Sequence, residues 1–155
     1  MKVDIRALLK AVKCTLLVPP QGVDNTVFAG NTYIDTQGLG SVLFLLSAGS
    51  LAAAIGSTAA TTPPLVEECD TSGGSYTAVT GAALAAVISA TDDDKMYGIH
   101  VDLSKSHKRY MRVQAPTAGD GSASESFLAI TAIGFPADVS PADAAGMGLA
   151  EIIEA

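Results

Sequence analysis

The feature that most constrains this chain is an unbroken apolar run, Val42 to Leu46, that follows a glycine-containing turn. The run mixes β-branched, aromatic and aliphatic side chains, and Gly38 and Gly40 stand where the backbone must reverse. A short run bounded by glycine is typical of a strand covered on both faces, although a buried helix gives the same pattern. The chain must therefore place a second layer or a partner against this strand.

Further short strand-like segments, separated by Gly, Pro, Asp and Ser, account for much of the remaining chain. The clearest is 96–103, where apolar residues alternate with residues of the opposite face, and Met111 and Val113 are expected to point inward in 109–115. The pattern predicts an all-β fold, an antiparallel two-sheet β-sandwich of jelly-roll type with about eight strands. The strands expected are 12–18, 33–35, 42–46, 65–69, 76–79, 96–103, 109–115 and 127–135.

Several turns and connections carry their own expectations. Pro19 and Pro20 should end the first strand, because proline cannot donate to a ladder. Residues 70–74 should form a hairpin loop whose glycines adopt positive φ. Residues 47–63, which are rich in small side chains, are left open between loop and strand, and 81–90 between a short helix and a loop that crosses between the sheets.

The chain of 155 residues has the size of one domain, which we divide into an N-terminal arm (1–11), a β-sandwich (12–136) and a tail (137–155). The tail is expected to be partly helical, with Ser140 as N-cap and Pro141 in the first turn. The arm is basic and the tail acidic, so each is expected to reach a complementary surface on a neighbouring subunit or another partner. The residues expected to make oligomer or partner contacts are Lys2, Arg6, Lys10, Leu128, Ile130, Phe135, Met147, Leu149, Ile152 and Ile153.

Charge argues against two classes of partner. Nine basic and 16 acidic residues leave a net charge of −7, which disfavours nucleic acid. Residues 36–66 are uncharged and longer than the ~20 residues of a membrane span, but glycines and prolines interrupt them and both borders are acidic. We expect neither a membrane span nor a secretory signal, because residues 2–13 intersperse charge among the apolar residues.

No group of residues indicates catalysis, a metal or a cofactor. Cys14 and Cys69 are interpreted as small buried hydrophobes, and His100 and His107 as surface imidazoles without ligand partners at convincing spacing. Asp92 to Asp94 is expected to be a solvated turn, because it lacks the glycine and bidentate glutamate of a calcium loop. The basic cluster at 105–109 is expected to be a solvated sheet edge. We therefore expect a protein that is not an enzyme.

Five segments, in this order, resemble small proteins encoded beside the major capsid protein of tailed bacteriophages. They are YIDTQGLGSVLFLLSAG, LVEECDTSGGSYTAV, DDDKMYGIHVDL, KRYMRVQA and FLAITAIGFP, and the similarity covers residues 12–136. The stretch 47–63 and the acidic tail depart from that family.

The resemblance implies a capsid decoration, or cement, protein with a jelly-roll fold and no catalytic residues. Such a protein is made in the cytoplasm of the bacterial host and lies on the outer face of the virion. Its expected partners are the major capsid protein and itself, as a homodimer or homotrimer. The alternative is a carbohydrate-binding jelly-roll module on a virion surface, which is less well supported by a chain with no Trp and four Tyr. A hydrolase has no supporting residues.

Overall fold

A computed structural model of the protein describes residues 12–136 and 151–154. The arm 1–11 and most of the tail, with its expected helix start at Ser140 and Pro141, lie outside the described residues. Within the described ranges the chain forms strands and no helix. The strands are β1 (Lys13–Val23), β2 (Ile34–Asp35), β3 (Ser41–Ala48), β4 (Ile55–Ser57), β5 (Leu65–Cys69), β6 (Thr77–Ala83), β7 (Met96–Asp102), β8 (Tyr110–Val113), β9 (Pro116–Ala118), β10 (Ser126–Phe135) and β11 (Glu151–Glu154).

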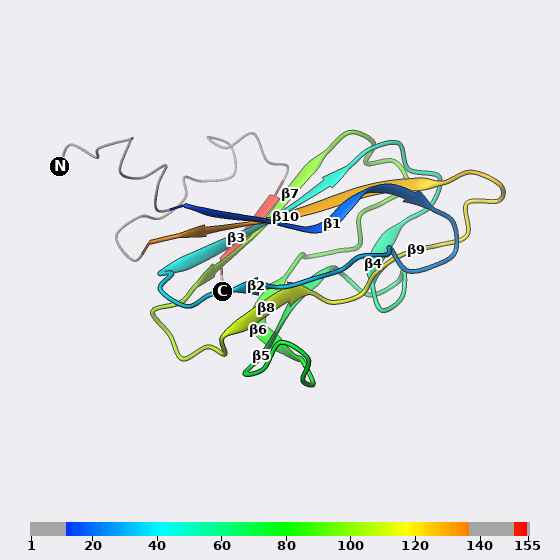
Figure 1. The fold of residues 1–155 in the computed structure, drawn as a ribbon. Coiled ribbons are helices and arrows are strands. Elements are labelled where there is room, and N and C mark those ends of the chain that lie inside the picture. Colours follow the sequence, from blue (N-terminus) through cyan, green and yellow to red (C-terminus); the bar gives the residue numbers. More distant parts are fainter. Residues whose placement is uncertain (1–11, 137–150, 155) are drawn as a thin grey trace.

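The strands form three sheets, two of which pack face to face as in a β-sandwich (Figure 1). The large sheet has the order β1-β10-β3-β7-β11, the small sheet has the order β2-β8-β5-β6, and β4 pairs with β9 alone. Neighbouring strands run antiparallel except β7 and β11, which are parallel. The all-β, antiparallel architecture expected from the sequence is therefore confirmed.

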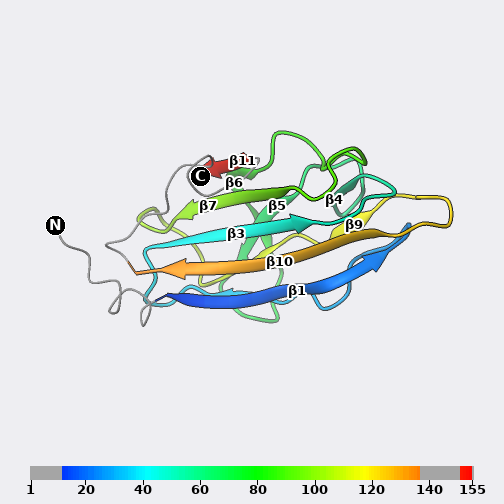
Figure 2. The ribbon, with the colours of Figure 1, turned by 90° about the horizontal axis from the view of Figure 1, so that it is seen from above.

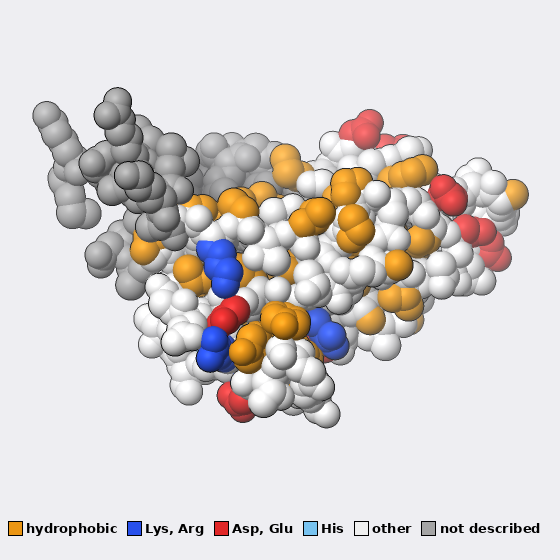
Figure 3. Space-filling view, viewed as in Figure 1, with side chains coloured by type: hydrophobic (Ala, Val, Ile, Leu, Met, Phe, Trp, Pro, Cys, Tyr) orange, Lys and Arg blue, Asp and Glu red, His pale blue; other side chains and the backbone are white. Residues whose placement is uncertain are grey.

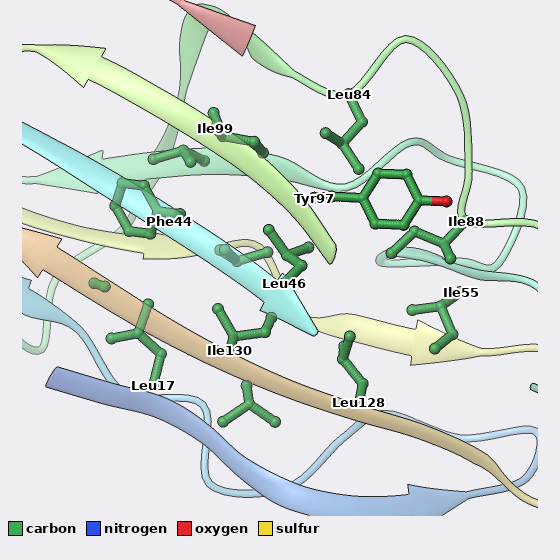
Figure 4. Packing of buried hydrophobic residues seen from close by; sticks show 14 of the residues in the cluster. Leu17, Phe44, Leu46, Ile55, Leu84, Ile88, Tyr97, Ile99, Leu128 and Ile130 are labelled. Atoms are coloured by element: carbon green, nitrogen blue, oxygen red, sulfur yellow. The ribbon is translucent and has the colours of Figure 1, made fainter. Parts of the chain in front are cut away.

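The core fills the space between the large and small sheets (Figure 4). Alternate side chains of each strand point inward, so each strand contributes every second residue. Burying such a side chain fully contributes roughly 1.5–3 kcal/mol. Fully buried examples are Leu17, Phe44, Leu46, Ile99 and Ile130 from the large sheet and Val66, Met111 and Val113 from the small sheet.

Most expected strands are present in the fold. β7 buries Tyr97, Ile99 and Val101, as its alternation predicts, and β5 pairs with β6 in the expected hairpin. β3 is buried along most of its length, and Gly38 supplies the positive φ of the turn before it. The period-2 pattern was informative here because one side of each strand meets the core.

The expectation that Pro19 and Pro20 end the first strand is wrong. β1 continues to Val23, and its register with β10 shifts on either side of Val18, which leaves both prolines without a ladder partner. β1 is an edge strand that pairs only with β10. An edge strand with bulges tolerates proline, because one row of its backbone groups faces away from the ladder.

The glycines of the β5–β6 loop do not adopt positive φ, contrary to expectation. Gly74 is instead required by close packing, since a Cβ there would lie 2.4 Å from Thr71 Oγ1 and 2.6 Å from Cys69 Sγ. The positive φ of this hairpin occurs at Gly81, inside β6. A loop longer than two residues does not need the left-handed turn of a tight hairpin.

The structure shows the conformation of the two segments, 47–63 and 81–90, for which the sequence left two alternatives. Residues 47–63 contain the end of β3, a loop and the short strand β4, which pairs with β9, a strand outside the eight that were expected. Residues 84–95 form a loop that crosses from the small to the large sheet, so the helix alternative is wrong. Leu84 and Ile88 anchor that loop in the core, and Ile88 bridges to Ile55 of β4.

The described part of the tail, Glu151–Glu154, is strand β11 beside β7, where the sequence suggested partial helix. Ile153 packs against the core. Among the described residues, no helix is long and apolar enough to cross a bilayer.

Candidate interaction surfaces

The outward side of the large sheet carries a continuous set of uncharged side chains, which we call the apolar face. The register of β1, β10, β3 and β7 places them on one side of the sheet, the side that Figure 2 presents to the viewer. None of these side chains is a carboxylate, an ammonium or a guanidinium, although the register places the Asp102 carboxylate on the same side, at the end of the sheet where β10 ends. The apolar face comprises Cys14, Leu16, Leu45, Ser47, Met96, Phe127, Ala129, Thr131 and Ile133.

Three large side chains of the apolar face are exposed: Leu16 (51%), Phe127 (44%) and Met96 (39%). The Phe127 ring lies against the backbone of Gly22, where an added Cβ would come within 2.7 Å of it. A groove of about 460 Å³ opens beside the ring, lined in part by Pro20 and Ser47. The surface thus combines projecting apolar side chains with a hollow that is open to solvent.

The contact roles expected for β10 need correction. Leu128 and Ile130 point into the core and are almost fully buried, so they are closed to a partner. Phe127 and the other outward residues of β10 occupy the surface instead. The alternation of β10 contains this information, but both sides of the strand are apolar, and only the position of the small sheet decides which side is buried.

The other expected contact residues have mixed outcomes. Phe135, at the end of β10, is half-buried, and Ile153 of β11 is partly buried against the core. The side chain of Ile152 is not described. Lys2, Arg6, Lys10, Met147 and Leu149 lie outside the described residues.

A second surface, which we call the tyrosine–arginine face, lies on the outward side of the small sheet at the end where β8 begins. The rings of Tyr33 and Tyr110 meet edge to face, with centroids 5.1 Å apart. The Arg109 guanidinium lies 5.2 Å from the Tyr110 centroid and donates two hydrogen bonds to the Asp35 carboxylate, at 2.9 and 2.8 Å. Stacking and a bidentate ion pair therefore hold this half of the surface in one arrangement.

The other half of the tyrosine–arginine face is built on a buried carboxylate. Glu67 is 4% exposed and accepts hydrogen bonds from Arg112 Nε (2.6 Å) and Gln114 Nε2 (3.2 Å). The Arg112 guanidinium lies 4.0 Å from the centroid of Tyr76. Figure 3 shows this arrangement as a group of hydrophobic side chains between Lys and Arg side chains over the small sheet.

Electrostatics keep the Asp35–Arg109 pair ionised. The hydrogen bonds from Arg109 are the main cause that lowers the pKa of Asp35 from 3.8 to about 2, with help from the Gln37 amide and Lys13. Burial is the main cause that raises the pKa of Tyr76 above its usual value. Asp35 is thus an anion and Tyr76 a neutral phenol throughout the physiological pH range.

The remaining charge of the described residues is unevenly placed. Six acidic residues lie at the end of the large sheet where β1 ends and β10 begins, and Lys95 is the only basic residue among the described ones there. Figure 3 shows acidic side chains at the right-hand and upper margins of this view. The acidic residues are Asp24, Asp92, Asp93, Asp94, Asp120 and Glu125.

The cysteines and histidines differ from expectation. Cys69 is buried as expected, but Cys14 is exposed on the apolar face, and both thiols are free. His100 is buried, and His107 is mostly buried and lies 3.0 Å from Glu68 Oε2, so neither is a surface imidazole. The strand pattern alone does not reveal what covers each side of a strand, so it did not predict which of these residues are buried.

The acidic turn around Asp93 and the basic cluster 105–109 both lie in loops between strands. In the part of the chain that the structure describes, no three His, Cys, Asp or Glu side chains gather as metal ligands. Asp93 is in the expected turn, and its carboxylate accepts a hydrogen bond from the Leu51 amide. The basic cluster 105–109 lies in the loop before β8, a strand inside the small sheet, so it does not protect a sheet edge.

Comparisons with protein-family models, curated proteins and solved structures found no match. The resemblance to capsid decoration proteins therefore rests on the five sequence segments alone.

Proposed function

We propose that this protein is a structural component of a tailed-phage virion. In this proposal it binds the outer surface of the icosahedral capsid as an oligomer and stabilises contacts between major capsid protein subunits. A protein that binds only the assembled shell adds its binding free energy to the stability of that shell at every site.

We also infer that the sandwich is wound as a jelly roll. β1 pairs with β10, β2 with β8, β3 with β7, and β5 with β6. Such nested antiparallel pairs are those of one long hairpin ribbon rolled into two sheets, which is the winding of double-sheet jelly rolls found in viral capsid proteins. The winding supports the fold expected from the resemblance, and fold by itself carries no function.

The observation that carries the proposal is the presence of two different contact surfaces on opposite sides of one small domain. The apolar face is suited to permanent association, because obligate interfaces are rich in apolar side chains. The tyrosine–arginine face has the residue types that dominate binding energy at protein interfaces. A cement protein needs both self-association and attachment to the shell, and these two surfaces could serve those roles separately.

Reconstituted heads test the proposal. The major capsid protein that the proposal implies would supply the shell, and occupancy would be counted on gels of purified heads mixed with each variant. We expect saturable binding that raises the temperature at which the heads disassemble. Charge reversal at the exposed guanidinium, Arg109→Glu, should reduce occupancy, whereas Lys95→Glu at the opposite end should not. Heads that bind no protein would refute the capsid function.

Carbohydrate binding is a second candidate, favoured by one observation. Three of the four tyrosines, Tyr33, Tyr76 and Tyr110, gather on the tyrosine–arginine face, and sugar rings stack on exposed aromatic side chains. The chain has no Trp, so its intrinsic fluorescence comes from tyrosine and directly reports binding near these rings. Titration with neutral and acidic oligosaccharides should change that emission if the candidate is correct. An unchanged emission up to millimolar sugar would exclude it.

A further inference from the structure

We propose that the apolar face binds the apolar face of a second copy, so that two sandwiches pair sheet on sheet about a two-fold axis. The inference rests on the oligomer in the proposed function and specifies its surface, stoichiometry and symmetry. Four arguments support a second copy as the occupant.

The first argument is charge. The protein carries a net charge of −7, so two copies repel one another through most of their surfaces. The side chains that make up the apolar face are uncharged, and six acidic residues lie at the end of the large sheet where β10 begins, with Asp102 of β7 at the other end. An antiparallel two-fold arrangement places the acidic ends of the two copies at opposite ends of the interface. Their separation, about the ~30 Å length of β10, exceeds the ~10 Å Debye length.

The second argument is that the neighbouring edge of the sheet is protected. β1 is one of the two edge strands of the large sheet, β11 being the other, and is the edge beside the exposed part of the apolar face. Pro19 and Pro20 lie within it, and its register with β10 is irregular around Val18. Prolines and bulges discourage edge pairing. Association of two large sheets is therefore favoured through the face rather than through this edge.

The third argument is self-complementarity. A two-fold interface brings a surface against itself, so each projecting side chain must meet a hollow on the same surface. Leu16 projects from β1, and the groove beside Phe127 begins at Pro20 of the same strand. The two are four residues apart, a separation that the bulges of β1 shorten below the ~13 Å of a regular strand. A two-fold axis midway between them places the Leu16 of each copy over the groove of the other.

The fourth argument is size. The accessible part of the face extends along β1 and β10 and over half of β3 and β7, an area on the order of 400–500 Å² from strand spacing and rise. The largest apolar patch on a typical monomer covers about 300–600 Å² and is often functional, so a patch of this size is compatible with a binding role but does not require one. A standard interface buries about 800 Å² per partner, so the face provides a small interface. We expect a dimer that dissociates at concentrations on the order of micromolar.

Sedimentation of the full chain tests the proposal, over roughly 1 to 300 µM to bracket the expected dissociation constant. A thiol reductant in the buffer removes any contribution from a Cys14 disulfide. We expect a reversible monomer–dimer equilibrium that persists or strengthens at high salt, because salt weakens no attraction in an uncharged interface and screens the repulsion between two acidic copies. Leu16→Lys should leave a monomer over the whole range, and so should Phe127→Lys.

Val27→Lys is the matched control. Val27 is 47% exposed, comparable with Leu16, but it lies outside the apolar face, so this variant should dimerise like the wild type. Far-UV circular dichroism of each variant confirms that the sandwich is folded. Alkylation of Cys14 gives a second measurement, which should slow as the wild type dimerises and stay fast in Leu16→Lys.

Several results would overturn the proposal. These are a wild type that stays at 15.6 kDa, a trimer, dissociation by salt, or a Leu16→Lys variant that still dimerises. A monomer whose Cys14 becomes reactive only after deletion of residues 2–11 would show that the N-terminal arm covers the face. Each outcome is independent of head binding, so a monomer that binds heads would end this inference and leave the capsid proposal standing.

Discussion

The two outward faces of the sandwich differ in the kinds of side chain that they expose to water. On the tyrosine–arginine face, Arg109 and Arg112 each have a carboxylate partner and stack on a tyrosine of the same chain. On the apolar face, Leu16, Met96 and Phe127 are exposed without such polar compensation. The first surface is therefore stable in water as part of a monomer. Covering the second surface with a partner removes apolar area from water and lowers the free energy.

The comparison also separates folding from binding. Side chains of the tyrosine–arginine face are fixed by interactions within the chain, so changing them should alter the stability of the isolated domain. The exposed side chains of the apolar face bury little area in the monomer, so changing them should mainly alter association. The following predictions concern the free energy of unfolding, measured by urea denaturation at concentrations below those of self-association.

The largest effect is expected at the buried carboxylate of the tyrosine–arginine face. Glu67→Ala leaves Arg112 and Gln114 without their acceptor and should lower the free energy of unfolding by about 2–3 kcal/mol. Glu125→Ala, at an exposed glutamate, is the control and should change it by less than about 0.5 kcal/mol. Equal effects of the two variants would contradict the structural role assigned to the Glu67 carboxylate.

A smaller effect is expected where backbone packing supports the apolar face. In Gly22→Ala the added methyl would lie 2.6 Å from Glu125 Oε2 and 2.7 Å from the Phe127 ring, so both side chains must move, at a cost of about 1–2 kcal/mol. Gly73→Ala has open space at the corresponding position and no positive φ, and should be neutral or stabilise by about 0.4–1 kcal/mol. If Gly22→Ala leaves the free energy of unfolding unchanged, the position of the Phe127 ring is not fixed in solution.

The exposed ion pair should contribute less and depend on pH. Because the pKa of Asp35 is lowered from 3.8 to about 2, its contribution is fully present above about pH 5 and is lost as the pH falls through 2. Asp35→Asn should cost about 0.5–1 kcal/mol at pH 7, the range for an exposed pair, and should flatten the stability profile between pH 4 and 2. Asp70→Asn, at an exposed aspartate without an ion pair to Arg109, serves as control. An unchanged profile in Asp35→Asn would assign acid sensitivity to other carboxylates.

The smallest effect is expected from an exposed residue of the apolar face. Met96→Gln keeps the length of the side chain and should change the free energy of unfolding of the monomer by no more than about 0.5 kcal/mol. The same variant should weaken self-association measured by sedimentation. A loss of stability comparable to that of Glu67→Ala would mean that the monomer already depends on Met96.

The strands were predictable because hydrophobic alternation is a local property. Segments such as 65–69 and 96–103 show it directly, and the structure contains β5 and β7 there. The short strands β4 and β9 were not predictable, because three residues are too few for a period to appear. Their pairing depends on the positions of the loops around them.

The candidate surfaces were only partly predictable. The surplus of apolar residues on β3 and β10 indicated that an outward face would be apolar, but the residues first assigned to contacts, Leu128 and Ile130, are in the core. The tyrosine–arginine face had no local signal. Tyr33, Tyr76 and Tyr110 are far apart in sequence and come together through the strand order β2-β8-β5-β6.

The sequence by itself determined that this chain forms short antiparallel strands, because composition, alternation and turn residues act over a few neighbouring positions. It also determined an acidic protein with more apolar strand surface than one core requires. The tertiary structure decided which side of each strand is buried, since that depends on which sheet lies opposite. It likewise decided that Pro19 and Pro20 are acceptable within β1, because edge position and bulges are properties of the assembled sheet.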